Sequence, residues 1–114
     1  MKVAIPTNEK KGLEDKVSEI FGRSSTFTII DVEGEEVKKV EVIENPASSY
    51  PYGAGPIVVK TLIDMGVDVI ITCRIGPSTS AILESKNIPV FKVPHGLSVK
   101  EALEKFLAER KKQP

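Results

Sequence analysis

The short apolar run VDVIIT, residues 67–72, constrains the fold of this chain more than any other stretch. It has the length of a strand, is rich in β-branched residues and is too short for a typical helix. Gly66 stops the helical pattern before it, and Gly76-Pro77 opens another helical pattern soon after it. The run therefore predicts a buried strand that lies between two helices along the chain.

The remaining apolar patterns predict four more strands. They lie at residues 3–5 (ended by Pro6), 25–32, 37–45 and 88–93. The second and third of these form an antiparallel hairpin around Glu33-Gly34, and alternating charges make its second strand the wetter one. The first strand is uniformly apolar, which is typical of a strand buried on both faces.

Three helices follow from the helical spacing of apolar residues. Pro56 suits the first position of one helix, Gly76-Pro77 begins the next, and a Ser98–Glu101 capping box begins the last. The predicted inward residues are Ile57, Val58, Leu62 and Met65 in the first helix, Ala81 and Ile82 in the second, and Val99, Ala102, Leu103, Phe106 and Leu107 in the third.

This element order predicts an α/β fold with a mixed sheet and helices on both faces. A chain of 114 residues, 40% of them hydrophobic, suits one domain over residues 1–114, with residues 109–114 frayed. The parallel strands end in three loops, and their carboxyl ends should meet along one edge, where open α/β sheets bind ligands. The loops are Pro6-Thr7, Thr72-Cys73-Arg74 and Pro94-His95-Gly96.

Charge and targeting signals narrow the class of protein. The 16 basic and 16 acidic residues cancel, whereas nucleic-acid-binding proteins usually carry a basic excess or stripe. One cysteine cannot form an internal disulfide, which fits a reducing cytosol. The opening MKVAIPTNEK lacks the pattern of a signal peptide, and no apolar run approaches the roughly 18 residues of a membrane span. We expect a cytoplasmic protein that binds neither membrane nor nucleic acid.

Two glycine-rich helix starts are candidates for an anion site. Gly53 and Gly55 precede one helix, Gly76 and Ser78 lie at the start of the next, and Arg74 is close by in the sequence. Free backbone N–H groups and the helix dipole favour an anionic ligand at such ends. Glycine and proline also mark ordinary helix starts, so the pattern alone leaves both interpretations open.

Cys73 and His95 are the candidate metal ligands. A nearby arginine and a helix start would favour the Cys73 thiolate, and His95 lies on a loop at the same predicted edge. The alternatives are a small buried residue that ends a strand and an ordinary surface histidine. The sequence contains no recognisable catalytic motif, so we do not expect an enzyme.

Five stretches together resemble the dinitrogenase iron–molybdenum cofactor biosynthesis family over about residues 1–108. They are MKVAIPT, VSEIFGRSSTFTIIDV, VIENPA, GAGPIVVKTLIDMGVDVIITCRIGPSTSAIL and IPVFKV. The resemblance implies a ribonuclease H-like, three-layer α/β/α sandwich with a five-stranded mixed sheet whose second strand is antiparallel. It also implies binding of iron–sulfur or iron–molybdenum clusters and their transfer between assembly proteins. Family members often carry histidine where this chain has Ile20, and in the loop that is SSYPYGAG here.

The leading interpretation is a non-enzymatic carrier for a metal–sulfur cluster or related anionic cofactor, with a cofactor-assembly or recipient protein as its partner. Arg23 and Arg74 would offset cluster charge, and Cys73, with His95, would contact metal. Gly53, Gly55, Gly76 and Ser78 would place backbone donors. A second interpretation is a module that binds a phosphate- or carboxylate-bearing small molecule at the same edge.

A third interpretation is a regulatory domain that binds a partner protein without metal. Its interface would be the loop with Tyr50 and Tyr52 or the strand at residues 37–43. An exposed edge strand can also pair with a second copy, so the expected state is a monomer or a weak homodimer.

Overall fold

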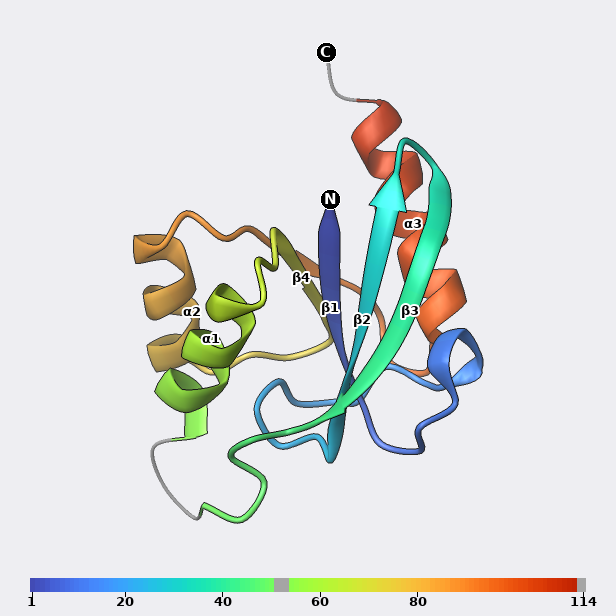
Figure 1. Cartoon of the computed structure of the whole chain (residues 1–114). Helices are drawn as coiled ribbons and strands as arrows, with labels where there is room; N and C mark the ends of the chain where they lie inside the picture. Colours follow the sequence, from blue (N-terminus) through green and yellow to red (C-terminus); the bar gives the residue numbers. More distant parts are fainter. Residues whose placement is uncertain (51–53, 113–114) are drawn as a thin grey trace.

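The computed structural model describes residues 1–50 and 54–112. Five strands, three α-helices and one short 3-10 helix follow one another along these residues (Figure 1). In chain order they are β1 (Lys2–Thr7), η1 (Gly12–Glu14), β2 (Thr26–Glu33), β3 (Glu36–Glu44), α1 (Ala54–Asp64), β4 (Val69–Thr72), α2 (Pro77–Ser85), β5 (Val90–Lys92) and α3 (Val99–Lys111).

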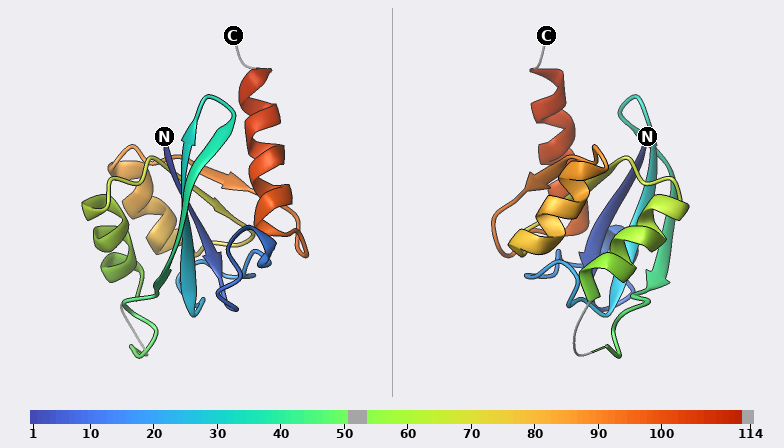
Figure 2. Two further views of the ribbon diagram at one scale, coloured as in Figure 1. Left: turned by 45° about the vertical axis from the view of Figure 1, so that its right-hand side comes forward. Right: turned by 90° about the vertical axis from the view of Figure 1, so that its left-hand side faces the viewer.

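The five strands form one mixed sheet in the order β3-β2-β1-β4-β5. β2 is antiparallel to both β1 and β3, whereas β1, β4 and β5 run parallel. Helices α1 and α2 cover one face of the sheet and α3 covers the other (Figure 2). The predicted three-layer α/β/α architecture with an antiparallel second strand is confirmed.

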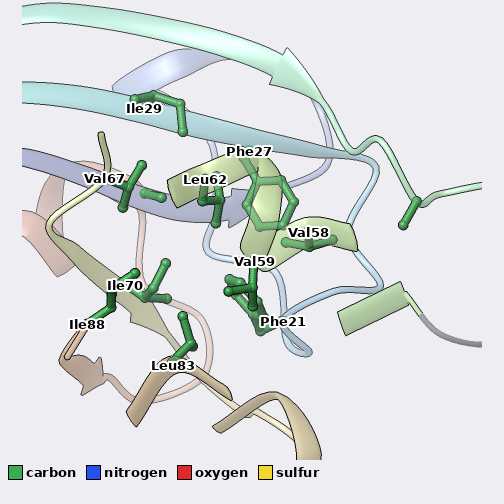
Figure 3. Packing of buried hydrophobic residues seen from close by; sticks show 12 residues of the cluster. Phe21, Phe27, Ile29, Val58, Val59, Leu62, Val67, Ile70, Leu83 and Ile88 are labelled. Carbon is green, nitrogen blue, oxygen red and sulfur yellow. The ribbon is translucent and has the colours of Figure 1, made fainter. Parts of the chain in front are cut away.

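Strand β1 shows why the molecule has two hydrophobic cores. Val3 and Ile5 pack on the α3 side, while Ala4 between them packs on the side of α1 and α2. This alternation is the period of two that any strand imposes on its side chains. The core under α1 and α2 is drawn in Figure 3, where Phe21 and Phe27 lie beside Val58, Val59 and Leu62.

Two local expectations differ from the structure. Pro6 lies within β1 and does not end it. Its lack of an N–H removes no hydrogen bond to β4, because β1 pairs with β4 only at Val3 and Ala4, before Pro6. In α2 the fully buried residue is Leu83, while Ala81 is exposed and Ile82 only partly buried. Because three apolar residues stand in a row there, helical spacing alone did not settle which of them faces inward.

The other helices agree with the apolar pattern. Helix α1 buries Val58, Val59 and Leu62, and α3 buries Val99, Ala102, Leu103 and Phe106. Helix α3 continues to Lys111, into the segment for which the sequence indicates fraying. The Lys111 ammonium lies 2.9 Å from the Glu35 carboxylate, in the turn between β2 and β3.

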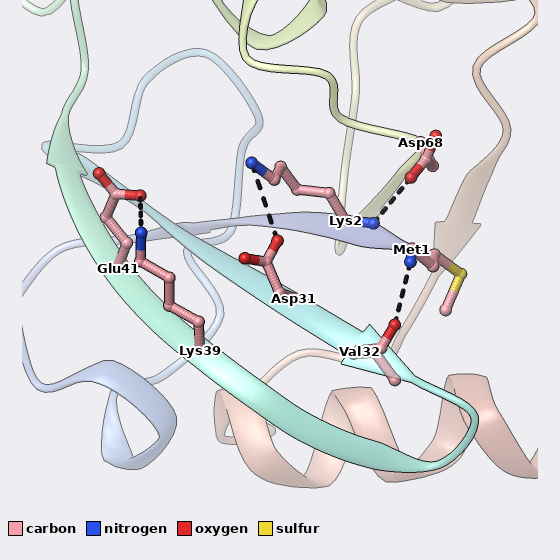
Figure 4. A network of polar contacts seen from close by, with 7 residues as sticks. All are labelled: Met1, Lys2, Asp31, Val32, Lys39, Glu41 and Asp68. Atoms are coloured by element: carbon pink, nitrogen blue, oxygen red, sulfur yellow. Dashed lines mark hydrogen bonds and ion pairs between the residues drawn. The ribbon is translucent and has the colours of Figure 1, made fainter.

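The amino end of β1 is closed by polar contacts (Figure 4). The N-terminal amine of Met1 donates to the Val32 carbonyl at 3.0 Å, and the Lys2 backbone N–H donates to the Asp68 carboxylate at 2.7 Å. The Lys2 ammonium also lies 3.8 Å from Asp31. The loops that follow the parallel strands gather at the opposite end of the sheet.

The predicted capping box of α3 is confirmed. The Ser98 side chain accepts from the Glu101 N–H, and the Glu101 carboxylate accepts from the Ser98 N–H, both at 3.0 Å. We expect Ser98→Ala to lower the free energy of unfolding by about 1 kcal/mol, because it leaves the Glu101 N–H without its acceptor at the helix start. Urea titration measures this loss. Ser25→Ala, an exposed serine in a loop, is the control and should leave the midpoint unchanged.

The same capping box makes a pH-dependent contribution to the stability of the fold. The hydrogen bond from the Ser98 backbone N–H, and then that of its side chain, lower the pKa of the Glu101 carboxyl in the folded state. A lowered folded-state pKa stabilises the fold above the unfolded carboxyl pKa, and the contribution is lost as pH falls through the folded pKa. The stability difference between wild type and Glu101→Gln should therefore shrink as the solution is acidified. A difference that grows in acid would contradict this assignment.

Candidate functional site

The carboxyl ends of β1, β4 and β5 lie together at one end of the sheet, where the loops after Thr7, Thr72 and Lys92 begin. A further segment, Ser18 to Arg23, is hydrogen-bonded to this end of the sheet. The Ser18 N–H donates to the Pro6 carbonyl at 2.7 Å. This segment is thus held against the end of β1.

The backbone of Arg74 holds the middle of that segment. The Arg74 N–H donates to the Glu19 carbonyl at 3.0 Å, and the Phe21 N–H donates to the Arg74 carbonyl at 2.8 Å. Ile20 and Arg74 therefore pair as a single parallel bridge beyond the end of β4. The side chains of Arg74 and Glu19 also form an ion pair at 3.2 Å.

Gly22 and Asn45 shape the turn that carries Arg23. Gly22 has a φ of 93°, a backbone conformation that residues other than glycine rarely adopt. The buried Asn45 amide donates to the carbonyls of Gly22 and Ser24 at 3.1 and 2.8 Å. The turn is thus built by one glycine and one buried amide, and its next residue, Arg23, is exposed.

A pocket of about 480 Å³ lies between this turn and the starts of α1 and α2. The turn, the start of α1 and the start of α2 each contribute to it. Its lining residues are Ile20, Phe21, Gly22, Arg23, Gly55, Pro56, Gly76, Ser78 and Thr79.

The start of α2 presents backbone donors to this pocket. Gly76 caps the helix and has no side chain that could accept a hydrogen bond from the first turn. Pro77 has no N–H, so Ser78 and Thr79 carry the first backbone donors of the helix. Together with the dipole of α2, these groups favour an anion in the pocket.

Arg23 is the one charged side chain among the described residues that line this pocket. Within residues 1–50 and 54–112, the ion pairs do not include Arg23. Arg74, by contrast, is neutralised by Glu19 and does not line the pocket. The pocket thus combines one unpaired cation with backbone donors and the apolar surfaces of Ile20, Phe21 and Pro56.

Of the residues predicted to form the site, four lie together: Arg23, Gly55, Gly76 and Ser78 line this pocket. Gly53 falls outside the described residues. Cys73 is partly buried and His95 is exposed, and neither lines the pocket. In the part of the chain that the structure describes, no three His, Cys, Asp or Glu side chains cluster as metal ligands would.

Phe21, Gly22 and Thr79 line the pocket although the sequence analysis gave them no part in the site. Ile20 lines it at the position where family members often carry histidine. A signal for Thr79 exists in Gly55, because a Cβ at position 55 would overlap Oγ1 of Thr79. A glycine in the first turn of α1 therefore indicates that another helix start lies against it. The sequence does not say which residue makes that contact.

Comparison with known proteins identifies a matching family. The family model described as dinitrogenase iron-molybdenum cofactor matches residues 1–109. The chain belongs to this family. One relative, the uncharacterised protein MJ0580 of Methanocaldococcus jannaschii, is 33% identical over 107 residues, which are 94% of this chain and 86% of that protein.

Solved structures of similar proteins share the fold. The apo form of the orange protein from Desulfovibrio gigas superposes with a TM-score of 0.82 at 29% identity, covering 96% of this chain and 88% of that one. The Thermotoga protein TM1290 gives a TM-score of 0.77 at 34% identity, with 96% and 89% covered. Across the described ranges of this family member, every helix is too short or too polar to cross a bilayer.

Proposed function

We propose that this protein is a non-enzymatic carrier that binds an anionic, sulfur-rich metal cluster as cargo in the pocket lined by Arg23 and the start of α2. Membership of the dinitrogenase iron-molybdenum cofactor family supports this class of cargo. The orange protein, a relative with the same fold, is described in its apo form, which implies a form that holds a ligand.

The composition of the pocket lining is the observation that carries the proposal. Among the described residues, the lining has one cation, backbone donors and apolar surface, with no thiol, imidazole or carboxylate. Such a set fits an anion that brings its own sulfur ligands, because the protein need only offset charge and donate hydrogen bonds. Strongly hydrated anions gain less from apolar walls, since they must give up water to contact Ile20 and Phe21.

This mode of binding changes the roles first expected for Arg74, Cys73 and His95. Arg23 offsets the cargo charge, whereas Arg74 positions Ile20 and Phe21 through its backbone. The proposal does not need a metal bond from Cys73 or His95. A reducing cytoplasm suits both the free thiol and an oxygen-sensitive cargo, and the recipient of the cargo would be a cofactor-assembly protein.

Anaerobic reconstitution tests the proposal. Protein incubated with iron(II), sulfide and molybdate, then desalted, should retain metal and show charge-transfer absorption. Arg23→Gln should weaken retention about tenfold, because one charge-assisted hydrogen bond to the cargo is lost. Lys92→Gln, an exposed cation outside the pocket, is the matched control and should retain wild-type loading.

Two further measurements separate the alternatives. Cys73→Ser should load normally, and a loss of absorption in that variant would mean that the thiolate ligates the cargo. Inorganic phosphate should raise the melting temperature little. Strong stabilisation by phosphate, with no metal retained, would replace the carrier with a module that binds small phosphorylated molecules.

A further inference from the structure

Strand β5 is an open edge of the sheet, and its free hydrogen-bonding groups can be assigned. The Ile70 N–H donates to the Pro89 carbonyl, and the Val93 N–H donates to the Thr72 carbonyl, both at 3.0 Å. Pro89 and Val93 therefore direct their ladder groups toward β4. Because these groups alternate along a strand, Val90 and Lys92 direct theirs away from the sheet.

Grooves flank this edge on both faces of the sheet. The α2-side groove, about 410 Å³, lies between α2 and the start of β5. The α3-side groove, about 380 Å³, lies between β5 and the second half of α3. Pro89 and Val90 line both grooves, so a strand added to β5 would direct alternate side chains into one groove and then the other.

The two grooves differ in chemistry. The α3-side groove contains the edge-to-face pair of Phe91 and Phe106, whose ring centroids are 5.3 Å apart, and it suits an apolar side chain. Its charged rim is mixed, with Asp68, Glu109 and Arg110, and Arg110 lies 5.9 Å from the Phe106 ring centroid.

The α2-side groove is lined by polar and apolar residues and carries a negative charge. Glu84 lines it together with Ser80 and Asn87. Among the ion pairs of residues 1–50 and 54–112, none involves Glu84, so its carboxylate is available to a basic side chain.

We propose that β5 is the docking edge for an extended segment of a partner protein, which pairs with the outward backbone groups of Val90 and Lys92. In this segment a basic side chain enters the α2-side groove beside Glu84, and its neighbour, an apolar side chain, enters the α3-side groove beside Phe91 and Phe106. By the same alternation Pro94 also faces away from the sheet, but it has no N–H to donate. The docking edge is therefore short. The proposal is independent of the cargo pocket.

The opposite edge, β3, is the competing site, and its features argue against docking. The pairing of β2 with β3 has a bulge between Asp31 and Val32, and bulges twist an edge away from further strands. β3 also carries two consecutive lysines, Lys38 and Lys39, whereas β5 carries one, Lys92, and edge lysines oppose pairing with another chain.

A peptide titration tests the proposal on the full-length protein. The probe is acetyl-Val-Lys-Val-Lys-Val-amide, added to isotopically labelled protein and followed by the backbone amide shifts. The largest shifts should fall on Val90, Lys92 and Glu84. A peptide with glutamate in place of lysine should bind about threefold more weakly, because it opposes Glu84. Methylation of the central backbone nitrogens should weaken binding about tenfold, because it removes the ladder donors.

Glu84→Gln should remove the preference for the lysine peptide, while Glu104→Gln, on the exposed side of α3 and outside both grooves, should leave it intact. Shifts centred on β3, an equal response to the methylated peptide, or no response at millimolar peptide would each overturn the proposal. The methylated peptide keeps the test decisive even if a protein variant folds poorly, since it leaves the protein unchanged.

Discussion

Replacing Phe27 with alanine is expected to lower the free energy of unfolding by about 3–5 kcal/mol. The Phe27 side chain is completely buried, and its ring centroid lies 5.4 Å from that of Phe21 at an interplanar angle of 57°. Truncation removes a large apolar side chain and leaves a cavity between β2 and α1 that the surrounding core cannot fill without moving. The melting temperature should fall by about 15–25 °C, measured by circular dichroism.

The matched control for Phe27→Ala is Tyr50→Ala. Tyr50 is an aromatic residue with 48% of its surface exposed, and its loss should change the free energy of unfolding by less than about 0.5 kcal/mol. Because Phe21 lines the pocket and packs against Phe27, we also expect Phe27→Ala to weaken retention of cargo at temperatures where the variant is still folded. A variant that melts within a few degrees of wild type would show that Phe27 is not a packing centre.

Replacing Gly55 with alanine is expected to lower the free energy of unfolding by about 1–3 kcal/mol. Alanine normally stabilises a helix relative to glycine, so the expected sign is the reverse of the propensity effect. The reason is steric, because the new Cβ would overlap Oγ1 of Thr79 and lie 3.5 Å from its Cβ. The threonine side chain is stiff at χ1, so relief requires a rotamer change or a separation of the two helix starts.

A double-mutant cycle isolates this contact. Thr79→Ala removes Oγ1, so Gly55→Ala in that background should cost nothing measurable, and the coupling energy should equal most of the single-mutant loss. Gly76→Ala is the control, because a Cβ there meets no atom within 4 Å although the residue lines the same pocket. Equal losses for Gly55→Ala with and without Thr79 would disprove the steric explanation.

Both substitutions change packing contacts that join the hydrophobic core to the pocket. The Phe21–Phe27 pair joins β2 to the turn that carries Arg23, while Gly55 and Thr79 join the starts of the two helices. The pocket is therefore formed where the packing of α1, α2 and the Ser18–Arg23 segment converges. Changes in that packing should alter binding even when the side chain replaced does not touch the cargo.

Much of the fold could be predicted because its signals are local and periodic. The uniform burial of β1 and β4, the wet second strand of the hairpin and the Ser98–Glu101 capping box each follow from a few consecutive residues. The prediction for α2 was wrong about Ala81, since its apolar residues are adjacent and spacing does not distinguish them. The buried one is Leu83, which packs into the core shared with α1.

The candidate site was only partly predictable. The glycine-rich helix starts and the arginines were recognisable in the sequence, but their pairing was not. Arg23 and Arg74 were assigned equal roles, whereas the structure pairs the Arg74 side chain with Glu19 and leaves Arg23 at the pocket. That distinction depends on a contact between residues 55 positions apart, which no local pattern encodes.

By itself, the sequence determined the order of strands and α-helices, the inward faces of α1 and α3 and the family to which the chain belongs. These properties depend on apolar periodicity and on turn chemistry, which act over a few residues. Only the tertiary structure decided that the turn at Gly22 meets the starts of α1 and α2, and that β5 lies open between two grooves. Such contacts arise when the sheet brings distant loops to one edge, and loops carry no periodic signal that would reveal their neighbours in advance.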